Sequence, residues 1–214
     1  MFDEIISQSL RQFQEDCRQL SEYHYPTVHN RGMRENHLGK ALSRRIVSTL
    51  ATKHIDALFS QLEDRDPNSC PFFKITGEDF VIWLVTHRML SGNKGCRRAV
   101  IDDISLLCEK AREYSDRPNQ YILAVADHWM DKTSTSRSLP FWWLGHMPIH
   151  QSDFLTQGIR LNHDATNLNE SLSDHPELLN GKFRTYHPLT RKQDSVPLYK
   201  YIMMTAQFSL NWTS

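Results

Sequence analysis

The unbroken apolar run Phe80-Val81-Ile82-Trp83-Leu84-Val85 constrains the fold more than any other stretch. β-Branched and aromatic residues dominate it, which is typical of a buried strand. However, Thr76-Gly77-Glu78-Asp79 precedes it in the manner of a helix capping box, and a helical apolar period then continues as far as Leu90. We therefore expect a helix here, with a buried strand as the alternative.

Helical periods also cover most of the remaining first 130 residues. Helices are expected over 2–23, over 34–62 (one helix, or two with a break near Thr52), over 96–114 and over 121–130, where a buried strand is again the alternative. Phe72–Ile75 has the composition of a short strand. The expected fold class is thus mainly α, with a small β element around 71–85 and a loop-rich C-terminal part.

The composition changes near residue 131, where Ser, Thr, Asn, Asp and Pro become common. We expect a helical core domain over 1–130 and a loop-rich segment over 131–194 that packs on this core or on a partner. The return of apolar residues after Pro197 predicts a C-terminal docking element over 195–214, either helix or strand.

Charge and cysteine usage limit the class of protein. Lys and Arg together number 25, as do Asp and Glu, so the net charge is zero and a nucleic-acid binder that works through bulk positive charge is disfavoured. The four cysteines form no C-x-x-C pair, and the acidic start lacks a signal sequence. We expect a cytoplasmic protein with reduced cysteines, no membrane segment and no cofactor.

Two basic stripes are candidates for nucleic-acid or phosphate contact. The first consists of Lys40, Arg44 and Arg45, and the second of Lys94, Arg97 and Arg98. The second opens a helix after the glycine-containing loop Ser91–Gly95, where backbone N–H groups can bind an anion. Simple solvation of a helix face is the alternative. A DNA-binding regulator would require both stripes to lie on one surface.

Aromatic and histidine-rich stretches suggest a partner surface. Tyr23, His24, Tyr25, Trp142 and Trp143 are the candidate interface residues, since exposed aromatic groups are typical of interfaces.

Imidazole and carboxylate groups that lie close in the sequence offer a metal-site candidate. His146, His150 and Asp153 form this group, although Pro148 interrupts the helix that would align them.

An enzymatic alternative rests on acidic residues. Glu35 would be a helix acid, Asp56 or Asp79 a strand acid, and Phe80–Val85 a core strand. With a helix and a strand following, this order resembles the PD-(D/E)xK nuclease core, whose carboxylates bind Mg²⁺. Thr86-His87-Arg88 stands where E-x-K would be expected, so the resemblance implies a degenerate or divergent α/β nuclease-fold protein.

The leading interpretation is a non-catalytic accessory or adaptor subunit, because no complete catalytic motif is present. The helix over Phe2–Leu20, the helical stretch Arg34–Leu62 and the core Phe80–Met130 resemble the small middle subunits of bacterial three-component defence systems of the Lamassu type. That resemblance implies partner subunits, an SMC-like ATPase and a nuclease, with DNA contact in antiviral or anti-plasmid defence.

Overall fold

Residues 2–23, 35–62, 70–114, 119–190 and 195–212 are described by the computed structural model of this chain. They form a six-stranded mixed sheet in the order β1-β2-β3-β4-β6-β5. The strands are β1 (Ala57–Gln61), β2 (Phe72–Gly77), β3 (Phe80–Arg88), β4 (Asn119–Trp129), β5 (Leu178–Tyr186) and β6 (Tyr201–Leu210). The helices are α1 (Phe2–Tyr23), α2 (Glu35–Ala51), α3 (Lys94–Arg112), α4 (Ser134–Leu144), α5 (Gln151–Thr156) and α6 (Leu168–Ser171). The expectation of a mainly α fold is wrong, since the chain is α/β.

The run Phe80–Val85 lies in the central strand β3, not in a helix. β3 pairs antiparallel with β2 and parallel with β4, and its first eight residues are all buried. A strand that is covered on both faces is apolar over most of its length and shows little alternation. Its sequence therefore also fits a helical period, which is why helix was expected.

The helix expected over 34–62 ends at Ala51. His54 has a φ of 59°, a left-handed conformation that cannot continue a right-handed helix. The chain then turns into the edge strand β1, which pairs antiparallel with β2. Likewise the stretch 121–130 belongs to strand β4, whereas the helix expected over 96–114 is confirmed as α3.

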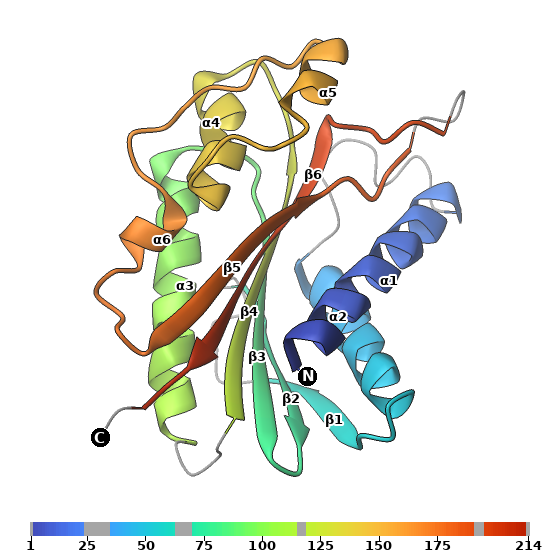
Figure 1. Ribbon diagram of the computed structural model, residues 1–214, viewed down its shortest axis with the longest axis vertical. Helices are drawn as coiled ribbons and strands as arrows, with labels where there is room; N and C mark the ends of the chain where they lie inside the picture. Colours follow the sequence, from blue (N-terminus) through green and yellow to red (C-terminus); the bar gives the residue numbers. More distant parts are fainter. Residues whose placement is uncertain (1, 24–34, 63–69, 115–118, 191–194, 213–214) are drawn as a thin grey trace.

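Helices cover both faces of the sheet (Figure 1). α1 and α2 lie on one face, and α3 and α4 on the other. One apolar cluster joins α1 and α2 to the sheet through side chains such as Phe13, Ile46 and Leu84. A second joins α3 and α4 to it through Trp83, Ile104 and Trp143. α1 thus confirms the amphipathic helix expected at the start of the chain.

The segments on either side of residue 130 share one apolar core. β6 pairs antiparallel with β4 along its whole length, from Tyr201 opposite Trp129 to Leu210 opposite Gln120. The apolar cluster under α3 contains side chains from Phe72 to Leu210. The C-terminal element is therefore an inner strand of the sheet. None of the helices in the described ranges is long and apolar enough to cross a bilayer.

Candidate functional site

The three acids of the nuclease hypothesis lie at opposite ends of the sheet. Glu35 begins α2, and its backbone carbonyl accepts a hydrogen bond from Thr86 Oγ1 at 2.7 Å, near the end of β3. Asp79 directly precedes the first residue of β3. Six residues of β3 separate Asp79 from Thr86, the residue that contacts Glu35. At the usual rise per residue this is a distance of roughly 20 Å along the strand. Asp56 precedes β1 at the Asp79 end, because Ala57 pairs with Gly77. The acids do not converge.

Thr86-His87-Arg88 occupies the place in β3 where a nuclease of this type would have its E-x-K motif. Mg²⁺ requires several oxygen ligands around one point. Among the described residues, each cluster of at least three metal-ligating side chains includes a cysteine, and none consists of carboxylates alone. The residues present therefore do not fit a magnesium nuclease centre.

A cavity of about 440 Å³ opens where the parallel strands β3 and β4 end. It is lined by Arg88, Met89, Leu90, Asp127, His128, Trp129, Met130, Asp131, Leu198 and Lys200. The carboxyl ends of parallel strands are a common place for ligands in α/β folds. This cavity is thus the candidate site by position, although no residue in it was singled out from the sequence.

Hydrogen bonds within the protein already engage two titratable groups that line this cavity, those of Asp127 and His128. Tyr201 Oη donates to the buried Asp127 carboxylate at 2.9 Å, and burial together with Asp127 raises the pKa of Tyr201. His128 lies 2.6 Å from the Met89 carbonyl through Nδ1 and 2.7 Å from Ser136 Oγ through Nε2. Burial lowers the pKa of His128, so it stays neutral near pH 7. The arrangement suits binding more than acid–base catalysis.

The two basic stripes lie on helices that cover opposite faces of the sheet (Figure 1). Lys40 and Arg44 are exposed on α2, whereas Arg45 forms an ion pair with Asp16 of α1. Lys94 and Arg98 are exposed on α3. The single surface required by the DNA-binding regulator interpretation is therefore not formed.

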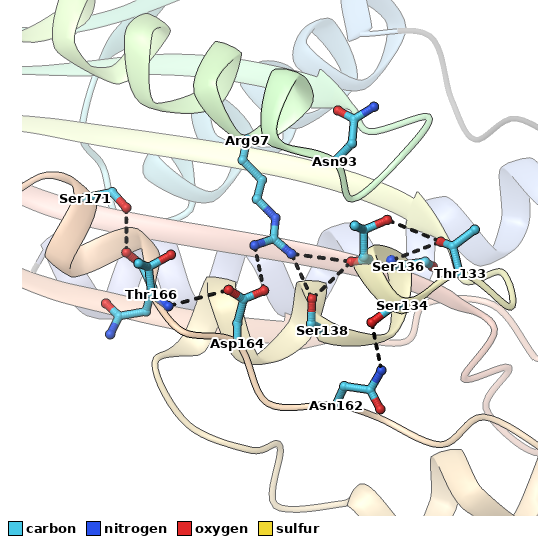
Figure 2. Close-up of polar contacts among 12 residues, drawn as sticks. Asn93, Arg97, Thr133, Ser134, Ser136, Ser138, Asn162, Asp164, Thr166 and Ser171 are labelled. Atoms are coloured by element: carbon cyan, nitrogen blue, oxygen red, sulfur yellow. Dashed lines mark hydrogen bonds and ion pairs between the residues drawn. The ribbon is translucent and has the colours of Figure 1, made fainter.

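Arg97 points inward and holds three segments together (Figure 2). Its guanidinium donates to Asp164 at 2.7 Å and to Ser138 Oγ at 2.9 Å, and it lies over the Trp142 ring. It therefore fastens α3 to α4 and to the chain that follows α5. The role expected for Arg97 in phosphate contact is wrong, because its side chain is only 11% exposed and both of its terminal nitrogens form hydrogen bonds inside the protein.

The loop before α3 is shaped for packing. Asn93 caps α3 by accepting a hydrogen bond from the backbone N–H of Cys96 at 2.9 Å. A Cβ atom on Gly92 would lie 2.2 Å from the carbonyl oxygen of Thr135 in α4. The close approach of α4 thus explains Gly92, whereas the anion-loop interpretation stays a prediction.

Trp142 and Trp143 belong to the core. Each is about 1% exposed, and Trp143 Nε1 donates to the Thr205 carbonyl of β6 at 2.9 Å. The expectation that they form a partner surface is wrong, because α4 turns both rings toward α3 and the sheet. The other interface candidates, the Tyr23 side chain and residues His24 and Tyr25, lie outside the described residues.

The histidine-rich segment after α4 does not gather into a metal site. His150 Nδ1 lies 3.7 Å from Asp153 Oδ2, and both side chains are exposed. Asp153 also accepts a hydrogen bond from Tyr199 Oη at 2.8 Å, and His146 contacts the neighbouring Met147 carbonyl. These residues form no cluster of three ligands among those described.

Two clusters of potential metal ligands were missed by the sequence analysis: Cys70 with His87 and Asp103, and Cys108 with His175 and Glu177. Their members are far apart in the sequence and match no motif. The first cluster could be expected from the sequence only if residues 80–88 were assigned to a strand. Alternation then places His87 on the same face as Trp83 and Val85, against α3.

Comparisons with known proteins give only weak similarities. No family model matches the chain, and no curated protein matches its sequence. Among solved structures, selenomethionine TDP2 from Caenorhabditis elegans matches with 11% identity and a TM-score of 0.34, over 73% of this chain and 51% of that chain. Truncated TDP2 from the same organism gives 9% and 0.32, over 73% and 67%. Humanized D. rerio TDP2 with 14 mutations gives 9% and 0.29, over 78% and 90%.

This chain spans about half the length of the first of these structures. TM-scores of 0.29 to 0.34 do not show a shared fold, and no activity follows from them.

Proposed function

We propose that this chain is a non-catalytic subunit of a multiprotein assembly, built on a divergent nuclease-like α/β core. The order α2-β1-β2-β3-α3-β4, with β3 central and parallel to β4, supports the nuclease-like arrangement of elements. The placement of Glu35 and Asp79 at opposite ends of β3 is the observation that carries the non-catalytic part.

A partner surface is supported by exposed apolar side chains in one short segment. Ile149 is 89% exposed and Leu155 is 58% exposed, on either side of the start of α5. Single exposed apolar residues are ordinary, but two large ones within seven residues favour contact with another protein. The partners we propose are an ATPase or a nuclease of a three-component defence assembly, with DNA contact through Lys40 and Arg44.

Affinity purification of the tagged chain from its native host, at moderate salt, tests this proposal. We expect a stoichiometric ATPase or nuclease to co-elute with the wild type and to be lost with the double variant Ile149→Asp/Leu155→Asp. Leu58→Asp is the matched control, because Leu58 is 81% exposed but lies on the edge strand β1. Elution of the wild type alone, or as a homodimer, would contradict the proposal.

A further inference from the structure

Cys70, His87 and Asp103 come together at the side of the sheet that α3 covers. Cys70 precedes β2, His87 lies near the end of β3, and Asp103 lies in the middle of α3. Cys70 Sγ is 3.3 Å from His87 Nδ1, and His87 Nε2 is 3.3 Å from Asp103 Oδ2. His87 and Asp103 are both buried, and Cys70 is half-buried.

The geometry differs from a Cys-His-Asp hydrogen-bond relay. The two nitrogens of an imidazole point in diverging directions, so a thiol and a carboxylate bonded one to each would lie on opposite sides of the ring. Here the sulfur, one ring nitrogen and one carboxylate oxygen all lie within 4.8 Å of one another. The three groups therefore lie close enough together to be ligands of one ion.

These ligand types and spacings fit a zinc ion. Zinc bonds of about 2.0–2.3 Å at tetrahedral angles place neighbouring ligand atoms roughly 3.3–3.7 Å apart. Because a single zinc ion binds only one imidazole nitrogen, one of the two 3.3 Å contacts, Sγ to Nδ1 or Oδ2 to Nε2, falls at this spacing, and the third ligand atom lies within 4.8 Å. A thiolate ligand disfavours Mg²⁺ and Ca²⁺, which prefer oxygen, while sulfur, imidazole and carboxylate together suit Zn²⁺.

We propose that Cys70, His87 and Asp103 form a Zn²⁺ site with three protein ligands, whose fourth position is taken by water. The ion joins the start of β2, the end of β3 and α3, three segments that are distant in the sequence. Zinc binding at this site stabilises the folded protein, because the unfolded chain does not bring the ligands together.

The second cysteine cluster is less suited to a metal. There, His175 Nε2 is held at 2.7 Å by Ser105 Oγ, which belongs to neither cluster of ligands, and His175 Nδ1 lies 3.3 Å from Glu177 Oε1. Burial raises the pKa of Cys108 to about 12, so its thiol keeps its proton. A metal would have to displace that proton and also break the contact with Ser105.

Metal titration of the full-length protein, after dialysis against a chelator, tests the proposal. Zn²⁺ is titrated in competition with a chromogenic chelator, and we expect one tightly bound ion per chain. Cys70→Ser and Asp103→Asn are expected to weaken binding by roughly 10- to 100-fold or more. The half-buried Cys96, changed to Ser, and the buried Cys108, changed to Ala, are the controls and should bind as the wild type does.

Co²⁺ titration of the wild type gives a reading that does not depend on whether the variants fold. A tetrahedral site with one thiolate should produce a sulfur-to-cobalt charge-transfer band near the ultraviolet together with intense visible bands. Absence of these bands in the wild type would overturn the proposal. Loss of Zn²⁺ binding in Cys108→Ala with retention in Cys70→Ser would also overturn it, by placing the ion at the other cluster.

Discussion

Replacing Trp143 by alanine should lower the free energy of unfolding by about 3–5 kcal/mol, measured by urea denaturation followed by far-ultraviolet circular dichroism. The ring is about 1% exposed inside the cluster between α3, α4 and the sheet. The substitution leaves a cavity there, and it also removes the hydrogen bond from Trp143 Nε1 to the Thr205 carbonyl. Domains have total stabilities of about 5–15 kcal/mol, so the variant would lose a large part of its margin.

Trp143→Phe separates packing from hydrogen bonding in this prediction. Phenylalanine refills much of the volume but cannot donate to Thr205, so a loss of about 1–3 kcal/mol is expected. An interface role would give a different pattern. Unchanged stability of Trp143→Ala, with loss of a co-purifying partner, would contradict the burial of this ring.

Arg97→Met should cost about 2–3 kcal/mol of stability, because it leaves the carboxylate of Asp164 without its cation in a mostly buried position. The side chains of this pair are 11% and 17% exposed. Methionine keeps the aliphatic part of the side chain, so the substitution leaves little cavity. The loss of stability therefore measures the contribution of the polar network of Figure 2. Chemical denaturation at pH 7 measures it.

Arg98→Met is the matched control on the next residue. Its partner is Asp102, and both side chains are more than half exposed, so a cost below about 0.5 kcal/mol is expected. If both residues served nucleic-acid contact, the two variants would instead be equally stable and would both lose DNA binding.

The effect of Arg97 should depend on pH. Burial raises the pKa of Asp164, but hydrogen bonds from Arg97 and Ser138 outweigh it and leave that pKa below its ordinary value of 3.8. The pair's stabilisation is therefore present above about pH 4 and is lost as the pH falls through the lowered folded-state pKa. The difference in stability between wild type and Arg97→Met should shrink in that acidic range.

The surface helices could be predicted from the sequence, but the inner strands could not. α1 and α3 each bury one face, so their polar residues recur with the helical period. β3 and β4 are covered on both faces, and their central stretches, 80–85 and 121–126, contain no charged residue that would mark the alternation of a strand. Thr76–Asp79, which resembles a capping box, spans the end of β2 and its turn into β3.

The candidate sites were harder to predict than the fold, because their residues meet only in three dimensions. Trp142 and Trp143 stand as an apolar island in a polar stretch of sequence, yet α4 buries both. Arg97 and Arg98 are neighbours of the same type, and only packing against α4 distinguishes them. His87 lies on β3 and Asp103 on α3, and no linear sequence motif predicts that these two side chains meet.

The central claim, a nuclease-like core without the catalytic carboxylates, is tested most directly by a cleavage assay. Purified wild-type protein and its Glu35→Gln variant are incubated with supercoiled, linear and single-stranded DNA in Mg²⁺ and in Mn²⁺. We predict no metal-dependent cleavage by the wild type above the level of the variant. Cleavage by the wild type that Glu35→Gln abolishes would contradict the claim, since it would place Glu35 in a working active site.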